Sequence, residues 1–283
     1  MEIILGKTAG FCYGVKRAVD GAKEALKNNS KIYCLGEIVH NQSVIEELEN
    51  QGMCFIKDIN EANGETIIRA HGASKDIYEE LKKRNIPIKD LTCPNVIKTH
   101  EIAQKYSNKD YYIVLIGIKD HPESIGTLSF CGKNSKLIQE KEDISSLLNE
   151  IQKSNKNDIL IMAQTTYNSI KFDEMAEILK DKLQGKKIEI KKTICEATQI
   201  RQKETIEISK NVDAMIIVGD KKSSNTNKLY DISKENCKNV FFIQKGEELD
   251  IEKLKKFKKI GIMAGASTPK EDIEKVKYRL EEI

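Results

Sequence analysis

A cysteine separates a strand-like run from a helix-like run in the sequence Lys-Thr-Ile-Cys-Glu-Ala-Thr-Gln, residues 192–199. The apolar run Ile188–Ile190 precedes Cys195, and Ala197–Ser209 follows it with helical periodicity. A helix N-terminus carries partial positive charge and unpaired N–H groups, which stabilise a thiolate. The sequence therefore predicts an α/β unit that presents one anionic sulfur where a strand gives way to a helix.

Two further cysteines lie in the same context. Cys12, in Gly-Phe-Cys-Tyr-Gly, follows the apolar run Glu2–Leu5 and precedes the helix-like Val15–Leu26. Cys93, in Leu-Thr-Cys-Pro-Asn, follows an apolar segment and precedes the helix-like Asn95–Tyr106. The three cysteines lie 81 and 102 residues apart, and each interval is the size of a small α/β unit. We predict a threefold internal repeat with one cysteine at a helix N-terminus in each copy.

The rest of the chain shows the same alternation of apolar runs and amphipathic segments. The apolar runs lack a polar residue at every second position, which is typical of strands buried on both faces of a parallel sheet. Strands that alternate with helices predict α/β architecture with right-handed crossovers. The other expected strands are Ile32–Leu35, Thr66–Ile68, Tyr111–Ile116, Ile159–Met162, Ala214–Val218, Val240–Ile243 and Ile260–Met263, and the other expected helices are Ser74–Arg84, Ser169–Leu183 and Lys270–Leu280.

The repeat predicts three α/β domains related by pseudo-threefold symmetry, each with a mostly parallel sheet. We place the first domain at residues 14–93, the second at 94–192 and the third at 193–283. Residues 1–13 are expected to add a strand to the third domain.

Charge and hydropathy argue against several classes of protein. The 283 residues include 47 Lys+Arg and 44 Asp+Glu, and this near-balance gives no electrostatic case for a nucleic-acid binder. The longest apolar run, residues 111–118, is far shorter than the ~20 residues that span a bilayer. No basic region precedes an apolar stretch near Met1, so we expect no secretory signal and a cytoplasmic location. The basic run Lys253–Lys259 is expected to be the solvated face of a helix.

The seven cysteines do not follow a disulfide framework, because their number is odd and their density is low. No CxxC pair occurs, which excludes ordinary zinc ribbons and thioredoxin-type redox motifs. Cys34 and Cys54 lie in apolar runs and are expected in the core, and Cys131 lies near a helix end. Cys237 lies among polar residues and is expected at the surface.

The three repeated cysteines predict a metal site. Thiolates that meet on a pseudo-threefold axis would hold three corners of an iron–sulfur cube, and the fourth iron could bind substrate as a Lewis acid. The alternative is that each cysteine packs as a small hydrophobe. One such cysteine would favour packing, whereas three in one context favour the metal site.

Polar residues follow the other apolar runs, at the carboxyl ends where parallel sheets build their sites. Three of the four histidines lie there, whereas His100 fits the middle of a helix. Hydroxyl and amide side chains share these ends and suit phosphate binding, although each could instead be a helix N-cap. Histidines beside such donors suggest a diphosphate. The candidate residues are His40, His71, His121, Thr165, Ser223, Ser224, Asn225 and Ser267.

Glu123 is the carboxylate of a His-Pro-Glu sequence at one of these strand ends. A carboxyl group in a desolvated pocket can keep its proton near neutral pH and deliver it as a general acid. The alternative is that Glu123 only stabilises the start of a helix after Pro122.

Together these motifs resemble one known family over essentially the whole chain. They are, in order, Gly-Phe-Cys12-Tyr-Gly-Val, Val-His40-Asn, Ala-His71-Gly, Thr-Cys93-Pro, His121-Pro-Glu123, Gln-Thr165-Thr, Thr-Ile-Cys195-Glu-Ala-Thr-Gln, Ser223-Ser224-Asn225-Thr-Asn and Ala-Gly-Ala-Ser267-Thr-Pro. The chain resembles the LytB/IspH family of 4-hydroxy-3-methylbut-2-enyl diphosphate reductases. Their reaction, the last step of the methylerythritol phosphate route to isoprenoids, is a two-electron reductive dehydroxylation that gives isopentenyl and dimethylallyl diphosphates.

The resemblance implies a cloverleaf of three domains around one central 4Fe–4S cluster. Cys12, Cys93 and Cys195 would be its ligands, and the open apical iron would bind the allylic hydroxyl oxygen of the substrate. Glu123 and Thr165 would relay a proton. A ferredoxin or flavodoxin would supply electrons, and no nucleic-acid or membrane partner is implied. The diphosphate would be held by His40, His71, His121, Ser223, Ser224, Asn225 and Ser267.

Three other functions share some of these features. A cluster enzyme of the quinolinate synthase type also uses three cysteines and an open iron, but its carboxylated substrates call for more Arg or Lys at the strand ends. A non-catalytic iron or redox sensor needs the cysteines but not Glu123 or the Ser-Ser-Asn run. A structural zinc site needs a fourth ligand beside the three cysteines.

Overall fold

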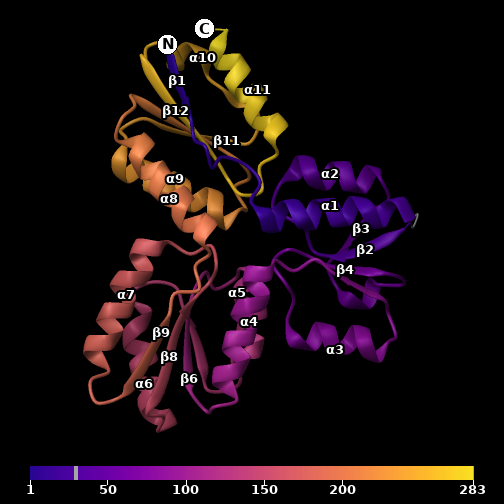
Figure 1. The fold of residues 1–283 in the computed structure, drawn as a ribbon, viewed down its shortest axis with the longest axis vertical. Helices are drawn as coiled ribbons and strands as arrows, with labels where there is room; N and C mark the ends of the chain where they lie inside the picture. Colours follow the sequence, from indigo (N-terminus) through magenta and orange to yellow (C-terminus); the bar gives the residue numbers. More distant parts are fainter. Residues whose placement is uncertain (29–30, 283) are drawn as a thin grey trace. The chain divides into compact units, whose positions relative to one another are not determined.

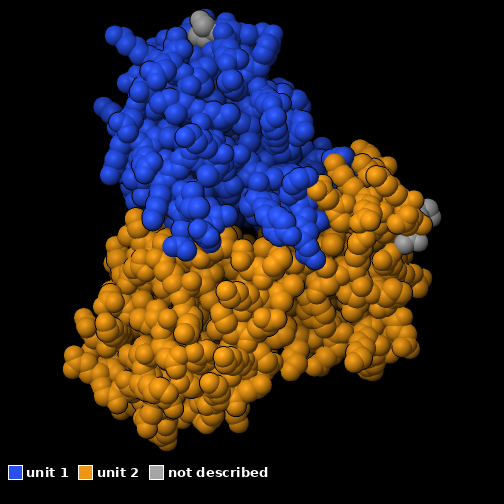
Figure 2. All heavy atoms as spheres, in the orientation of Figure 1, with its two compact units in different colours: residues 1–19, 39–48, 196–283 blue, residues 20–38, 49–195 orange. Residues whose placement is uncertain are grey.

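The computed structural model describes residues 1–28 and 31–282, in which strands and helices alternate along the chain (Figure 1). These residues form two compact units (Figure 2). Unit 1 comprises residues 1–19, 39–48 and 196–283, and unit 2 comprises residues 20–38 and 49–195.

Three four-stranded sheets form the framework, and all of their strand pairs are parallel. In unit 2, one sheet has the order β3-β2-β4-β5, with β3 at Met53–Ile56, β2 at Ile32–Leu35, β4 at Thr66–Ile68 and β5 at Ile88–Asp90. The other has the order β7-β6-β8-β9, with β7 at Ser135–Ile138, β6 at Tyr112–Ile116, β8 at Asp158–Ala163 and β9 at Lys187–Lys191. The sheet of unit 1 has the order β11-β10-β12-β1, with β11 at Val240–Ile243, β10 at Ala214–Val218, β12 at Lys259–Ala264 and β1 at Glu2–Leu5.

The strands fill the same four positions in every sheet, so β2, β6 and β10 are equivalent, as are β4, β8 and β12. A shared hydrogen bond marks the equivalence. The residue after β2, β6 or β10 is a glycine whose N–H donates to the last carbonyl of the adjacent edge strand. The pairs are Gly36 to Ile56 at 2.8 Å, Gly117 to Ile138 at 2.9 Å and Gly219 to Ile243 at 2.9 Å. This architecture confirms the prediction of three α/β domains with parallel sheets.

Helices cover both faces of the sheets. The apolar residues of β6 alternate, so that Val114 packs with α6 and α7 while Leu115 packs with α4. In unit 1, Ile216 of β10 packs with α11, and Ile217 packs with α8 and α9. The helices are α1 (Tyr13–Asn28), α2 (Gln42–Asn50), α3 (Lys75–Lys83), α4 (Pro94–Ser107), α5 (Pro122–Phe130), α6 (Asp143–Ser154), α7 (Ser169–Lys182), α8 (Glu196–Ser209), α9 (Ser224–Asn236), α10 (Ile251–Leu254) and α11 (Lys270–Glu281), with 3-10 turns at Ile59–Glu61 and Gly246–Glu248.

Two expectations about local structure are wrong. The basic run is solvent-exposed as expected, but α10 ends at Leu254 and β12 begins at Lys259. The buried Leu254 and the half-buried Phe257 anchor the chain between them as a turn rather than a long helix. Cys237 is 9% exposed, because the end of α9 directs it onto Met215 and Ile217 while its polar neighbours face solvent.

Other expectations hold. Cys34 is fully buried, Cys131 caps the end of α5, and His100 lies buried in α4 with its ring stacked on Phe130 at 4.4 Å. Cys54, which was expected in the core, is instead half-buried, because it lies on the edge strand β3. No helix in residues 1–28 and 31–282 combines the length and the apolar character that a bilayer crossing demands. The strand β1 pairs with β12, whereas the domain boundaries at 93/94 and 192/193 stay predictions.

Candidate active-site residues

Each of the three cysteines directly precedes a helix, as the sequence predicts. Cys12 precedes α1, Cys93 is the N-cap of α4, and Cys195 precedes α8. All three are half-buried and free of disulfide bonds. Their sulfurs are therefore available as ligands at helix N-termini, although their convergence on one centre stays a prediction.

A second repeated contact fixes the backbone at these cysteines. Each cysteine N–H donates to a carbonyl two residues beyond the strand β12, β4 or β8. That carbonyl lies in a four-residue turn closed by an N–H from its last residue to its first carbonyl. The cysteine bonds are Cys12 to Ala266 at 3.2 Å, Cys93 to Ala70 at 3.0 Å and Cys195 to Thr165 at 3.0 Å. In every sheet, the turn after one strand therefore fixes the backbone of the cysteine that follows the neighbouring edge strand.

In unit 2, Thr165 binds the carboxylate of Glu123 twice. The Thr165 N–H donates to one oxygen at 2.6 Å, and its hydroxyl donates to the other at 2.8 Å. Glu123 is 1% exposed, and this burial raises the pKa of its carboxyl to about 7 although the two bonds from Thr165 oppose the rise. A carboxyl with this pKa holds or releases a proton near neutral pH, which is the property of a general acid. The predicted pairing of Glu123 and Thr165 is present.

Two candidate histidines also lie together in unit 2. The rings of His71 and His121 meet edge to face with their centroids 5.2 Å apart. His121 is the N-cap of α5, and its Nδ1 accepts the N–H of Glu123 at 3.1 Å. A neutral His121 therefore carries its proton on Nε2, from which it can donate to an anion. His100 is not part of this group, as expected from its place in a helix.

Gln164 supports this cluster and was not among the predicted site residues. It is fully buried, and its Oε1 accepts the N–H of Ile118 at 2.9 Å and the hydroxyl of Ser124 at 3.2 Å. Its Nε2 donates to the hydroxyl of Thr166 at 2.9 Å. The amide thus ties the start of α5 to the turn of Thr165. An amide directly after a fully apolar strand is the signal that could have identified it.

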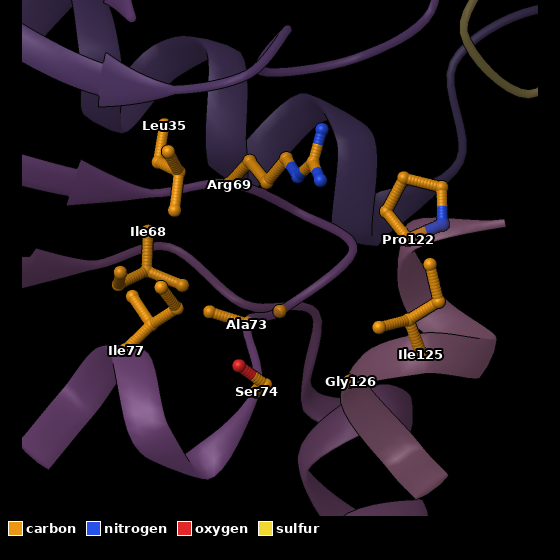
Figure 3. Close-up of a pocket in the computed structure, with 10 residues that line it drawn as sticks. Leu35, Ile68, Arg69, Ala73, Ser74, Ile77, Pro122, Ile125 and Gly126 are labelled. Atoms are coloured by element: carbon orange, nitrogen blue, oxygen red, sulfur yellow. The ribbon is translucent and has the colours of Figure 1, made fainter. Parts of the chain in front are cut away.

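A cavity of about 200 Å³ opens beside this cluster in unit 2. Leu35, Ile68 and Ile77 face Pro122 and Ile125 across it, and Arg69 reaches in from the turn after β4 (Figure 3). The residues that line it include none of the predicted site residues. The cavity is therefore separate from the candidate groups described above.

In unit 1, the Ser-Ser-Asn run forms the N-terminus of α9. Ser223 is the N-cap, and its Oγ accepts the N–H of Thr226 at 3.3 Å, which leaves the hydroxyl proton available to a ligand. Ser224 and Asn225 are the first residues of α9 and are 6% and 4% exposed. Unpaired N–H groups and the dipole make a helix N-terminus favourable for an anion.

The side chain of Asn225 lacks a hydrogen bond at both of its polar atoms, as judged from residues 1–28 and 31–282. Leaving a buried polar group unpaired costs about 1–3 kcal/mol. A bound oxyanion at the start of α9 would accept from Nδ2 of Asn225 and remove the cost at that atom. This orphaned side chain is the observation that best fits a phosphate group in unit 1.

His40 and Ser267 lie together in unit 1. The Ser267 hydroxyl donates to the backbone carbonyl of His40 at 2.8 Å, and Ser267 is 6% exposed. Ser267 can bind an anion only after its hydroxyl rotates away from that carbonyl, because the group has one proton. Thus His40, Ser267, Cys12 and the Ser223 run lie in unit 1, and the other predicted residues lie in unit 2.

Comparison with known proteins gives consistent matches over the full chain. A relative from Caldanaerobacter subterraneus subsp. tengcongensis, a 4-hydroxy-3-methylbut-2-enyl diphosphate reductase, is 40% identical over 98% of this chain and 97% of its own. The structure of a reductase from Plasmodium falciparum matches with a TM-score of 0.90 at 32% identity, covering 99% of this chain and 87% of that one. A structure described as (E)-4-hydroxy-3-methyl-but-2-enyl diphosphate reductase, the terminal enzyme of the non-mevalonate pathway, matches with a TM-score of 0.71 at 40% identity over all of both chains. The family model described as LytB protein matches residues 3–281, and the chain belongs to that family.

Proposed function

We propose that this chain is a 4-hydroxy-3-methylbut-2-enyl diphosphate reductase. It removes the allylic hydroxyl of (E)-4-hydroxy-3-methylbut-2-enyl diphosphate and forms isopentenyl and dimethylallyl diphosphates. The reaction consumes two electrons and two protons, and the hydroxyl departs as water. The observation that carries the proposal is the buried Glu123–Thr165 pair in a member of this family whose three repeats each place a cysteine at a helix N-terminus.

LytB proteins are iron–sulfur enzymes in general, and the donor set here fits such a group. Cys12, Cys93 and Cys195 are not in disulfide bonds and lie at helix N-termini, where a thiolate is favoured. They would hold one 4Fe–4S cluster with three protein ligands and one open iron. When bound, the cluster supplies a Lewis acid for the hydroxyl oxygen and carries the electrons.

The diphosphate would be bound by donors among the predicted site residues. These donors are His40, His71, His121, Ser223, Ser224, Asn225 and Ser267. A hydrogen bond to a charged group contributes about 1.5–3 kcal/mol, so several of these would anchor a small substrate. The unpaired amide of Asn225 supports this role.

Glu123 supplies the proton that the departing oxygen needs. Its raised pKa keeps about half of the carboxyl groups protonated near pH 7. Thr165 holds both carboxylate oxygens, orients the acid and passes its proton through the hydroxyl. Thr165 therefore has two roles in this proposal. It binds the substrate, and it takes part in the proton relay from Glu123.

The proposal also includes the electron donor, the location of the enzyme and the bounds of its domains. A ferredoxin or flavodoxin would deliver the electrons, and the enzyme would act in the cytoplasm. The three domains would span residues 14–93, 94–192 and 193–283 with strand β1 joined to the third.

An anaerobic assay tests the proposal. Reduced methyl viologen is mixed with protein of verified iron and sulfide content, and 4-hydroxy-3-methylbut-2-enyl diphosphate is added. We expect rapid oxidation of the viologen and five-carbon diphosphate products. No turnover by protein with an intact cluster would reject the reductase and favour a carboxylate-using cluster enzyme or an iron sensor.

A further inference from the structure

The loop that leads to Cys12 departs from the repeat. Six residues separate β1 from Cys12, whereas two separate β5 from Cys93 and three separate β9 from Cys195. A longer loop has more conformations to lose when it is fixed, so it needs more contacts to hold one conformation. The Cys12 loop therefore poses a positioning problem that the two shorter loops lack.

Each shorter loop is held by a side-chain bond close to its cysteine. The N–H of Thr92, next to Cys93, donates to Asp90 at 2.9 Å. The hydroxyl of Thr193, two residues before Cys195, accepts the N–H of Ala163 at 2.8 Å. The Cys12 loop is held instead by two side chains of helix α8.

Glu204, from the middle of α8, binds the first half of the Cys12 loop. One carboxylate oxygen accepts the Lys7 N–H at 2.6 Å, and the other accepts the Thr8 N–H at 2.9 Å. The Thr8 hydroxyl also donates to Glu204. These bonds and the nearby Arg201 keep the pKa of Glu204 below its usual range, so the acceptor is a carboxylate at neutral pH.

Arg201, one helical turn earlier on α8, binds two backbone carbonyls of the same loop. Its Nε donates to the Thr8 carbonyl at 2.8 Å, and its Nη2 donates to the Gly10 carbonyl at 2.7 Å. Arg201 is 3% exposed, and all of these partners belong to unit 1. Gly10 has a φ of +100°, which other residues rarely adopt, so this carbonyl marks the sharp bend just before Cys12.

We propose that Arg201 and Glu204 are positioning residues that fix the Cys12 loop and thereby set the sulfur of Cys12 for the iron–sulfur cluster. The pair holds donors and acceptors of residues 7, 8 and 10 from one rigid helix. The inference rests on the proposed function, in which Cys12 is a ligand. It predicts that loss of either side chain changes the reactivity of Cys12 more than that of Cys93 or Cys195.

The first test measures the loop without relying on activity. Full-length cluster-free protein is labelled with iodoacetamide under anaerobic conditions, and the rates at the three cysteines are separated by mass spectrometry. We expect Glu204→Ala and Arg201→Met to speed labelling of Cys12 at least tenfold relative to Cys93. Hydrogen exchange of peptides that cover residues 6–12 should accelerate in parallel. Glu207→Gln is the matched control, since Glu207 is an exposed carboxylate on α8.

The second test reads the cluster. After reconstitution, the reduced Glu204→Ala protein should give an altered electron paramagnetic resonance spectrum and lose iron faster to a chelator. Arg201→Lys should restore most of the wild-type spectrum, because one ammonium can still reach one carbonyl. If Arg201→Met does not fold, Glu204→Gln is used in its place, because the amide keeps an acceptor but loses the charge. We expect it to label Cys12 at a rate between those of wild type and Glu204→Ala.

The outcomes separate this inference from the proposed function. Unchanged labelling and exchange of the loop in folded Glu204→Ala and Arg201→Met overturn the positioning role, even if Cys12→Ser abolishes the cluster. A normal cluster in Cys12→Ser overturns the ligand assignment instead, whatever the loop does. Faster labelling of Cys12 together with an altered spectrum supports both.

Discussion

The N–H and the hydroxyl of Thr165 donate hydrogen bonds to the two carboxylate oxygens of Glu123, at 2.6 and 2.8 Å. The Glu123 side chain is almost completely buried from solvent. Thr165 also receives the N–H of Cys195 on its carbonyl at 3.0 Å. One residue therefore touches both the proton donor and the backbone of a proposed cluster ligand.

Replacing Glu123 with Gln should preserve substrate binding and abolish most turnover. The amide keeps the shape of the acid but cannot deliver a proton, and loss of a general acid typically costs about 10²-fold or more in rate. Steady-state kinetics with reduced viologen should show a kcat about 10²-fold or more below that of wild type, with a similar KM. Retained kcat would remove Glu123 from this role.

The pH dependence of turnover should follow the protonation of Glu123. Its pKa is raised to about 7, so the acid form is lost as the pH rises through that value. We expect kcat to fall tenfold per pH unit well above pH 7. A kcat that stays flat from pH 7 to 9, measured with a donor whose potential does not change, would contradict the assignment.

The same pKa predicts a stability effect. A carboxyl whose pKa is about 7 when folded and near its model value of 4.5 when unfolded stabilises the fold fully below pH 4.5 and loses that contribution as the pH rises through 7. Since Gln does not ionise, Glu123→Gln should unfold with a free energy higher than wild type by on the order of 3 kcal/mol at pH 8. At pH 4 the difference should nearly vanish. Urea unfolding at both pH values is the measurement, and an equal difference at both would refute the linkage.

Replacing Cys93 with Ser should impair the cluster, whereas Cys34→Ser should leave it intact. Cys93 is half-buried at the N-terminus of α4, whereas Cys34 is fully buried in β2, where burial raises its thiol pKa to about 12. Iron and sulfide analysis of anaerobically purified protein distinguishes the two. Full iron content in Cys93→Ser protein would disprove the ligand assignment. Equivalent losses are expected for Cys12→Ser and Cys195→Ser.

Asn225→Leu should stabilise the ligand-free protein and weaken substrate binding. The buried amide lacks partners among the described residues, so an apolar side chain of similar size removes an unpaid desolvation cost of about 1–3 kcal/mol. We expect a higher free energy of unfolding together with a KM raised at least tenfold. Asn211→Leu is the control, because Asn211 is exposed just beyond the end of α8 and its amide donates to the Glu207 carbonyl at 2.7 Å. Unchanged KM in Asn225→Leu would show that the amide does not bind substrate.

The central strands were predictable because both of their faces are apolar. The runs at β6 and β10 are fully buried and could be read directly from the sequence. The edge strand β5 was not among the expected strands, since Ile88–Asp90 is short and exposes Ile88 and Asp90. Only the apolar middle of the edge strand β9, Ile188–Ile190, was predicted, because Lys187 and Lys191 at its ends are charged and exposed. Edge position is a property of the assembled sheet that a local pattern does not encode.

The candidate residues were predictable where a repeat or a motif marked them. Cys12, Cys93 and Cys195 share a context, and Glu123 lies in a distinctive His-Pro-Glu sequence. Arg201 and Glu204 carried no such mark, because charges one turn apart on a helix usually face solvent. Their role depends on contact with a loop that is distant in the sequence, since Arg201 and Thr8 are 193 residues apart. Such long-range contacts exist only in the folded chain.

The pairing of β1 with β12 has a consequence for how the protein is made. Glu2 lies opposite Lys259 in the sheet of unit 1, so the ribosome completes the partner strand long after β1 has emerged. At about 5–20 residues per second, the wait is roughly 10–50 s. During synthesis the Cys12 loop therefore waits without its partner strand, and we expect it to reach its final conformation only after β12 has been made.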